Sequence, residues 1–261
     1  MALFHLNFSS DALKTCVSAN VIIPQNTHSM IGIDQSAEEG TRKTLWLLHG
    51  LSDDYSGWMR RTSIERYALR HNLCVVMPSA GRSWYTDSVL GNYYTYIAEE
   101  LPGIMRRFFR CMSDEREYNY IAGLSMGGFG ALKIGLSHPE RYAGIASFSG
   151  SVDLAPRLDD PGYKHYSSLR TVFGTKEDFL CNGSDLFRLA ETCERKPKLY
   201  MWCGTEDHNL DGNRKLSAHL KKLGYDLDYN ESEGAHRWEY WDTQIETVLD
   251  RWFEPAAVKM K

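Results

Sequence analysis

Short apolar runs alternate with longer segments of helical period along most of this chain. The runs are rich in β-branched and aromatic residues, as in "TLWLL" and "LCVVM", and the segments between them repeat apolar residues every three to four positions. Such alternation is typical of βα units around a mainly parallel sheet. Eight strands are predicted, at residues 4–8, 16–23, 43–48, 74–77, 118–122, 144–148, 198–203 and 227–231.

Helices are predicted between most of these strands and after the last one. The first two strands follow each other without a helix, so we expect them to form an antiparallel hairpin at an edge of the sheet. The pattern predicts an α/β fold in a single domain, 1–261, with a mainly parallel eight-stranded sheet and helices on both faces. The predicted helices are residues 63–71, 95–111, 126–137, 213–223 and 237–253.

One region, about residues 151–194, departs from the alternation. It contains "LDDPGYKHYSSLRTVFGTKEDFLCNGSD", which is rich in turn formers and aromatic residues, and it is too long for a simple connection between two strands. Long insertions of this kind are usually functional. We expect a small cap of short helices over an active site, with a surface excursion that has no role in binding as the alternative.

Composition and charge remove several classes of partner and cofactor. The net charge of −4 argues against a nucleic-acid or anionic-membrane partner. The first residues lack a basic start followed by a long apolar run, and no later stretch approaches about 18 apolar residues, which together predict a cytoplasmic protein. Six cysteines are too few for a dense disulfide framework, and without a CxxC pair or a His/Cys cluster we expect no metal.

The strongest chemical signal is a glycine-rich turn around one serine. Gly123-Leu124-Ser125-Met126-Gly127 matches G-x-S-x-G, follows the apolar strand "YNYIA" and precedes the helical segment "MGGFGALKIGLS". This strand-turn-helix context is the one in which a nucleophilic serine stands clear of a tight turn. A glycine turn with no chemical role is the alternative. We predict Ser125 as the nucleophile.

A serine nucleophile requires a base and an acid farther along the chain, in the order Ser, Asp or Glu, His. His236 stands in a loop between the last predicted strand and the last helix, where such a base belongs, whereas His208 adjoins the acid candidates and His219 lies within a predicted helix. Asp207 follows the strand at 198–203 and is the candidate acid. Glu206 and Asp211 are its rivals.

A site of this kind also needs two backbone N–H donors for a developing oxyanion. Met126 follows the serine at the start of a helix and supplies one N–H. In "TLWLLHGLSDDYSGW", the pair His49-Gly50 lets the chain turn so that the N–H of Leu51 faces Ser125.

With "HGLSDDYSGW", "GLSMGGFGAL", "CGTED" and "GAHRWEYW" all in place, the chain resembles the serine esterases of the α/β-hydrolase fold. More narrowly, it resembles the esterase D and bacterial tributyrin-esterase group, related to S-formylglutathione hydrolases and to acetyl and feruloyl carbohydrate esterases. "PSAGRSWYTDS" and "YYTYIAEELP" also look like that group. The resemblance implies a triad of Ser125, His236 and Asp207, with Leu51 and Met126 as the N–H donors, no cofactor, and a dimer or tetramer by analogy.

The expected reaction is hydrolysis of short-chain acyl esters, from acetyl to butyryl, through an acyl-enzyme. Large rings near the catalytic loops would form a small acyl pocket, with core packing as their alternative role; they are Trp58, Trp84, Tyr85 and Trp238. The arginines beside these loops could meet a polar or anionic alcohol portion, such as an acylated saccharide; they are Arg60, Arg61 and Arg82.

Three alternatives to ester hydrolysis remain. Mycolyltransferases share this fold and triad, so an acyltransferase is one alternative. A thioesterase of the S-formylglutathione hydrolase type is another. It is disfavoured because Ser52 and Asp53 follow His-Gly-Leu here, where those hydrolases carry threonine and cysteine. A binding protein on a hydrolase scaffold usually lacks a triad member, and none is missing here.

Overall fold

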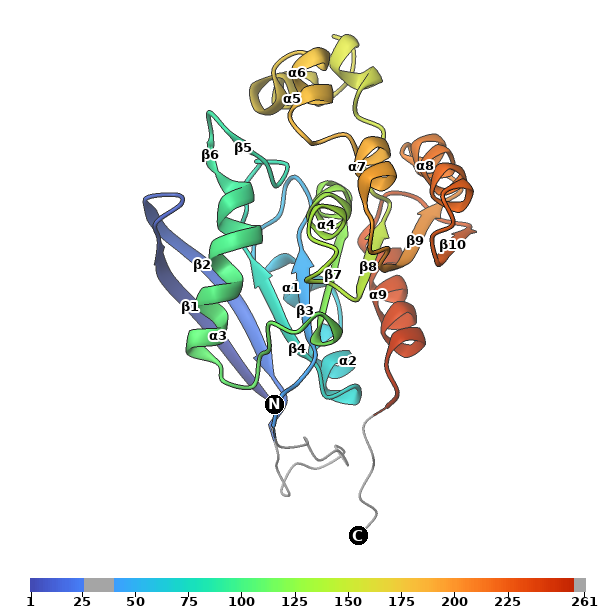
Figure 1. Cartoon of the computed structure of the whole chain (residues 1–261). Helices are drawn as coiled ribbons and strands as arrows, with labels where there is room; N and C mark the ends of the chain where they lie inside the picture. Colours follow the sequence, from blue (N-terminus) through green and yellow to red (C-terminus); the bar gives the residue numbers. More distant parts are fainter. Residues whose placement is uncertain (26–39, 256–261) are drawn as a thin grey trace.

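An eight-stranded sheet forms the centre of the molecule in the computed structural model, which describes residues 1–25 and 40–255 (Figure 1). Residues 26–39 and 256–261 of the predicted domain lie outside the described residues. The strand order is β1-β2-β4-β3-β7-β8-β9-β10, with β2 antiparallel to both neighbours and the other pairs parallel. The strands are β1 (Ala2–Ser10), β2 (Thr15–Ile23), β3 (Thr44–Leu48), β4 (Cys74–Pro78), β7 (Asn119–Leu124), β8 (Gly144–Phe148), β9 (Lys198–Gly204) and β10 (Leu227–Ser232).

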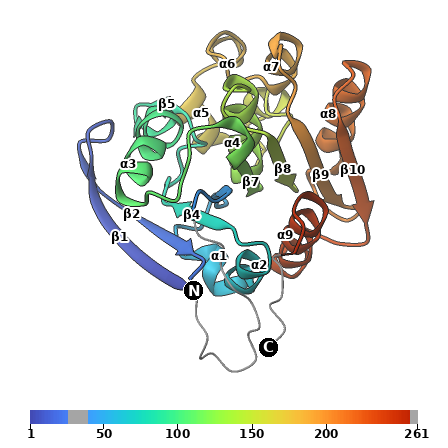
Figure 2. The same ribbon diagram turned by 60° about the horizontal axis from the view of Figure 1, so that its bottom comes forward.

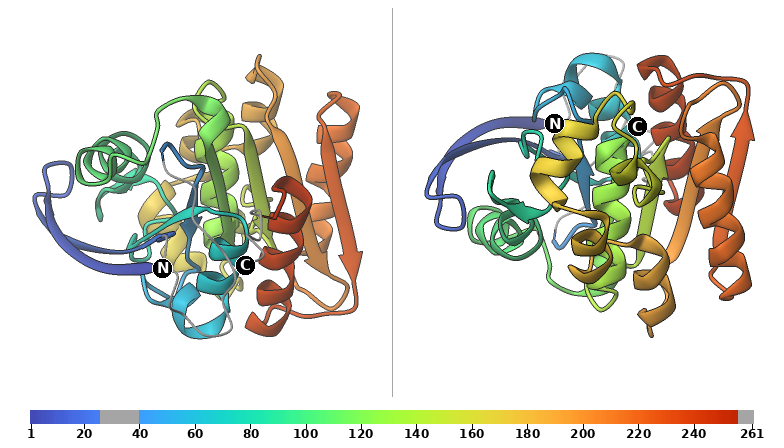
Figure 3. Two further views of the ribbon diagram at one scale, coloured as in Figure 1. Left: turned by 90° about the horizontal axis from the view of Figure 1, so that it is seen from below. Right: turned by 90° about the horizontal axis from the view of Figure 1, so that it is seen from above.

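Helices cover both faces of this sheet, as Figures 2 and 3 show. Helices α3, α4 and α8 lie on one face, and α1, α2 and α9 on the other. The α-helices are α1 (Gly57–Arg61), α2 (Ile64–Arg70), α3 (Leu101–Phe108), α4 (Met126–Ser137), α5 (Tyr166–Phe173), α6 (Lys176–Cys181), α7 (Leu186–Thr192), α8 (Leu210–Lys222) and α9 (Trp238–Trp252).

The alternation of side chains along β3 builds two separate apolar cores. Trp46 and Leu48 join the core under α3, α4 and α8, whereas Leu45 and Leu47 join the core under α1, α2 and α9. Successive strand residues point to opposite faces, so a strand covered on both sides is apolar throughout. This is why "TLWLL" reads as a continuous apolar run.

The predicted strands and helices are confirmed, with shifts at their ends. The predicted helix at 95–111 begins as a π-helical segment, η1 (Thr95–Glu100), in which Leu101 N–H donates to Tyr96 C=O. Pro102, which has no N–H, then lies in the first turn of α3. Helix α1 and the two-residue strands β5 (Asp87–Ser88) and β6 (Gly91–Asn92) were not predicted, because they are too short for periodicity to reveal.

Short helices fill the long connection between β8 and β9, the segment singled out in the sequence. It contains η3 (Pro156–Asp159), α5, α6 and α7, and Figure 1 shows α5 and α6 beyond one end of α4. Phe173 of α5 packs edge-on against Phe129 of α4, with ring centroids 5.9 Å apart, and against Phe179 of α6 at 5.2 Å. These buried aromatic contacts fix the connection to the helix that follows Ser125.

Candidate active site

Ser125 occupies a strained turn between β7 and α4. Its backbone angle φ is +54°, a value that residues other than glycine rarely adopt. The flanking glycines are needed because a Cβ at Gly123 would lie 2.3 Å from the Gly127 carbonyl oxygen, and one at Gly127 would lie 2.4 Å from the Leu48 carbonyl oxygen. Ser125 N–H donates to the Phe148 carbonyl oxygen at 2.9 Å. The turn is therefore held by its backbone and leaves the hydroxyl to face outward.

The structure brings Ser125, His236 and Asp207 together from three loops at the ends of β7, β10 and β9. His236 Nε2 lies 2.9 Å from Ser125 Oγ, and His236 Nδ1 lies 2.9 Å from Asp207 Oδ2. With Nδ1 donating to the carboxylate, Nε2 is left as the acceptor for the serine hydroxyl. This geometry can remove a proton from the serine as it attacks an electrophile.

Asp207 is held as a carboxylate although its side chain has no exposed surface. Burial works to raise its pKa, but the hydrogen bond and charge of His236, the Asn209 N–H and the Ser149 hydroxyl together hold the pKa below its usual value. Asn209 N–H donates to Asp207 Oδ1 at 2.9 Å. Asp207 therefore remains negative and fixes the orientation of the imidazole.

None of the rival acids and bases is placed to act with Ser125 as the predicted ones are. Glu206 and Asp211 are exposed and make no hydrogen bond to His236. His219 lies on α8, where its Nε2 is 3.3 Å from the Phe187 carbonyl oxygen. His208 is near the site, but its Nδ1 is 3.6 Å from Asp207 Oδ1, and the hydrogen-bond partner of Ser125 Oγ is His236.

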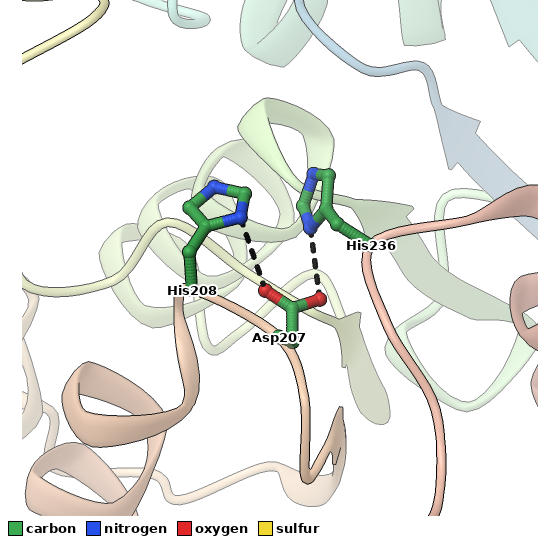
Figure 4. A group of neighbouring side chains, drawn as sticks. All are labelled: Asp207, His208 and His236. Carbon is green, nitrogen blue, oxygen red and sulfur yellow. Dashed lines mark hydrogen bonds and ion pairs between the residues drawn. The ribbon is translucent and has the colours of Figure 1, made fainter.

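Asp207, His208 and His236 also form a group that could hold a metal ion, since one ligand atom from each lies within 4.8 Å of the others. Figure 4 shows the two imidazoles above the two oxygens of the same carboxylate. Burial, followed by the charge of His236, lowers the pKa of His208. A cation bound here would compete with the hydrogen bond between His236 and Asp207, so a metal and the three-residue chain are alternative uses of the same atoms.

A buried histidine positions the Leu51 N–H. Ala80 N–H donates to His49 Nε2 at 2.9 Å, so the proton of the neutral ring is on Nδ1, which donates to the Gly50 carbonyl oxygen at 2.7 Å. Burial lowers the pKa of His49 and keeps the ring neutral. Because C=O and N–H of a trans peptide point in opposite directions, the Leu51 N–H faces away from His49.

The second N–H belongs to Met126, in the first turn of α4, where no N–H has a partner within the helix. Gly50 lies against the serine: a Cβ at Gly50 would lie 3.9 Å from Ser125 Cβ. Both predicted donors are thus adjacent to the serine.

A cavity of about 840 Å³ opens over the serine. Of the four aromatic residues predicted to form the acyl pocket, Trp84 and Trp238 line it. Trp58 and Tyr85 do not, which corrects that expectation: Trp58 Nε1 donates to the Leu48 carbonyl oxygen, and the Tyr85 hydroxyl donates to the His49 carbonyl oxygen. Both are buried core residues that support the loop carrying Gly50.

Trp241 lines the cavity and was not predicted. Its ring packs edge-on against His236, with centroids 4.9 Å apart, and its Nε1 donates to Ser149 Oγ at 3.1 Å. It lies three residues after Trp238 on α9, a spacing that places both rings on one helical face and could have revealed it.

Within the described residues, no helix is both long and apolar enough to cross a membrane.

Comparison with known proteins finds an esterase family model and relatives of one superfamily. A family model named Esterase, with the description "Putative esterase", matches residues 10–251. An acetyl esterase from Caldicellulosiruptor saccharolyticus is 30% identical, over 96% of this chain and 97% of that protein. An S-formylglutathione hydrolase structure from Staphylococcus aureus superposes with a TM-score of 0.82 at 30% identity, over 96% of this chain and 98% of that one. A diacylglycerol acyltransferase/mycolyltransferase, Ag85A from Mycobacterium bovis, is 26% identical over 78% of this chain and 71% of its own length.

Proposed function

The chain belongs to the esterase family of carboxylic ester hydrolases, and from that premise we propose that it is a serine esterase for short acyl groups. The observation that carries the proposal is the chain of two 2.9 Å hydrogen bonds from Ser125 Oγ through His236 to Asp207, at the floor of the cavity. Ser125 is the nucleophile, His236 the base and Asp207 the residue that orients it.

In the first half of the reaction, Ser125 Oγ attacks the ester carbonyl carbon while His236 Nε2 takes the hydroxyl proton. The carbonyl oxygen becomes an oxyanion that the N–H groups of Leu51 and Met126 stabilise. When the tetrahedral intermediate collapses, the bond to the alcohol oxygen breaks, and His236 returns its proton to that oxygen. The alcohol leaves and the acyl group remains on Ser125.

In the second half, water gives a proton to His236 Nε2 and attacks the acyl carbon. The same two N–H groups stabilise the second oxyanion, and the ester bond to Ser125 breaks with return of the proton to Oγ. Apart from the ester and water, the proposed reaction uses only groups of this chain.

Acyl groups from acetyl to butyryl are the proposed substrates. Trp84 and Trp238, together with Trp241, wall the cavity next to Ser125, and large rigid rings limit the length of chain that fits. The acetyl esterase relative agrees with this size. An acylated saccharide and assembly of the chain with itself remain predictions.

The segment 151–194 is proposed to act as a cap. Tyr163, Lys164 and His165 come from it and line the same cavity as Ser125. The Arg157 guanidinium joins it to the start of α8, since it donates to Asn209 Oδ1 at 2.7 Å. This contact favours a cap over a surface excursion without a role in binding.

The mycolyltransferase relative supports a second candidate function, transfer of the acyl group to an alcohol instead of water. Supplying a primary alcohol with the ester and measuring the transester product against the free acid decides between the two. The relative named S-formylglutathione hydrolase makes a thioester substrate a third candidate, which the same assay tests with an S-acyl glutathione.

The decisive experiment is hydrolysis of 4-nitrophenyl acetate, butyrate and octanoate by the wild type and by Ser125→Ala. We expect activity to fall from acetate to octanoate and to disappear in the variant. Activity that survives the substitution contradicts the assignment of Ser125, and equal rates for acetate and octanoate contradict the short acyl pocket.

A further inference from the structure

The mouth of the cavity is positively charged in a protein whose net charge is −4. Besides His236, its lining holds Arg61, Arg82 and Lys164 and two further histidines, but Asp53 is the one acidic residue among the described lining residues. Like-charged groups gathered in a concave site focus a field that attracts ions of opposite sign. The local excess of positive charge therefore favours the binding of a ligand that carries negative charge.

A second cavity, of about 580 Å³, adjoins the first. Arg82, Lys164 and His165 line both cavities, so these three residues stand where the two meet. The second cavity is also lined by hydroxyl residues of α5, including Ser167 and Thr171. The described lining of this second cavity holds no carboxylate.

Arg82 and Lys164 have no partner within the described chain. Neither makes a hydrogen bond or an ion pair among residues 1–25 and 40–255. Arg61 differs, because its guanidinium lies 5.7 Å from the centroid of the Trp238 ring. Arg60, which was expected to join these arginines, lines neither cavity.

The pKa of a neighbouring histidine reflects the same positive charge. Burial, followed by the charges of Lys164, Arg82, Arg157 and His236, lowers the pKa of His165. Arg157 adds to this charge, because within the described part of the chain its guanidinium donates only to neutral groups, the Tyr163 hydroxyl and Asn209 Oδ1. An anion would relieve repulsion among these groups.

Arg82, Lys164 and His165 line the same cavity as His236, the proposed base. His165 and His208 are both close enough to His236 for its charge to affect their titration. In the proposed reaction His236 protonates the departing alcohol oxygen, so the alcohol must lie on the histidine's side of the serine.

We propose that the alcohol portion of the substrate carries an anionic group, a carboxylate or a phosphate, which Arg82 and Lys164 bind where the two cavities meet. This inference rests on the proposed esterase function. The short acyl group lies against Trp84 and Trp238, and the anion lies at the junction with the second cavity, with the hydroxyl groups of α5 as further donors.

The test compares acetyl esters that differ only in the charge of the alcohol. The probes are 4-acetoxybenzoate and 4-acetoxyphenyl phosphate as anions and 4-acetoxybenzamide as the neutral match. kcat/KM is measured for the wild type, for Arg82→Gln, Lys164→Gln and the double variant, and for Arg60→Gln as an exposed control arginine outside both cavities. Dividing each variant's value by that of the wild type removes differences in intrinsic reactivity among the esters.

We expect the double variant to lose roughly 5- to 30-fold in kcat/KM on the anionic esters and less than about twofold on the neutral ester, since a charged hydrogen bond at a partly exposed site is weaker than a buried one. Raising the ionic strength from about 0.05 M to about 0.5 M should reduce the wild-type preference, because added salt shortens the screening length. The larger loss for carboxylate or for phosphate identifies which anion fits.

Equal losses on the charged and neutral esters, or the same loss in Arg60→Gln, overturn the inference and leave the esterase function intact. Failure of the wild type to hydrolyse any of the acetyl esters contradicts the proposed function, and the inference falls with it. The Ser125→Ala variant separates enzymatic hydrolysis from background in every arm.

Discussion

His236 Nε2 lies 2.9 Å from Ser125 Oγ, although the two residues are 111 positions apart in the chain. The two loops meet because β7 and β10 are parallel strands of one sheet, whose carboxyl ends lie at the same edge. The distance is within hydrogen-bonding range for a hydroxyl and an imidazole nitrogen. Ser125 is therefore already hydrogen-bonded to its proposed base before any substrate binds.

Replacing Asp207 with Asn tests the acid of the triad. The amide can donate to His236 Nδ1 and so favours the tautomer with its proton on Nε2, which cannot accept from the serine. We expect kcat to fall roughly 10³- to 10⁴-fold. Asp211→Asn is the matched control, since Asp211 is exposed, and should leave kcat unchanged. Steady-state kinetics on 4-nitrophenyl acetate decide, and a comparable fall in the control refutes the assignment.

His49→Ala tests whether the buried imidazole positions the Leu51 N–H. Without the donor to the Gly50 carbonyl oxygen, the peptide that carries this N–H is free to rotate. We expect kcat to fall about 10- to 100-fold with little change in KM, because the donor acts mainly on the oxyanion. His49→Asn, which retains a donor, should recover part of kcat. A rise in KM with unchanged kcat, or no recovery by Asn, indicates a purely structural role.

Gly123→Ala tests the close packing of the turn. A Cβ there would lie 2.3 Å from the Gly127 carbonyl oxygen, so we expect the free energy of unfolding to fall by about 1–3 kcal/mol or more. Gly103→Ala in α3 is the control: a Cβ there meets nothing within 4 Å, and it should stabilise the protein by roughly 0.5–1 kcal/mol. Urea unfolding of both variants measures the difference, and equal stabilities would show that the turn relaxes without cost.

Lys133 links stability to pH. It is buried on α4, its Nζ donates to Thr86 Oγ1 at 2.7 Å, and burial lowers its pKa from the ordinary lysine value of 10.5 to about 7. Between these pH values the unfolded chain binds more protons than the folded chain, so this residue makes the free energy of unfolding rise with pH in that window. Below about pH 7 its charge disfavours folding to the full extent.

Lys133→Met removes this titration. We expect the stability advantage of the Met variant to be largest near pH 6.5 and to shrink steadily toward pH 9.5, as followed by urea unfolding at each pH. Asp87, whose charge opposes the shift, and the Tyr94 ring, which lies 5.0 Å from Nζ, both interact with the Lys133 charge, so the Met variant loses these interactions together with the titration. A difference that does not depend on pH contradicts the shifted pKa.

Chelation separates the two uses of Asp207, His208 and His236. One ligand atom from each of these residues lies within 4.8 Å of the others. If no metal is bound there in the active enzyme, dialysis against EDTA should leave kcat/KM unchanged, whereas added Zn²⁺ should inhibit by competing for His236. His208→Ala should weaken that inhibition because it removes one ligand. Loss of activity with EDTA, restored by Zn²⁺, contradicts a metal-free mechanism.

The sequence by itself determined the strands and the order of the segments that carry the proposed triad. A parallel strand covered on both faces must be apolar throughout, so β3 and β7 can be recognised from their local composition. The turn at Ser125 requires flanking glycines, so it can be recognised in the same way. The sequence also predicted that His236 lies near Ser125, because loops after parallel strands meet at one edge of the sheet. Short elements such as α1 and β5 could not be predicted, because they contain too few residues for a periodic pattern.

Only the tertiary structure decided which neighbours meet. Asp207, Glu206 and Asp211 lie within five positions of one another, and the fold alone turns Asp207 toward His236. It also places Trp84 at the cavity and Tyr85, one residue later, in the core, because adjacent side chains point in different directions. Arg82 and Lys164 come from two loops far apart in the chain yet line the same two cavities, and no local sequence pattern predicts that placement.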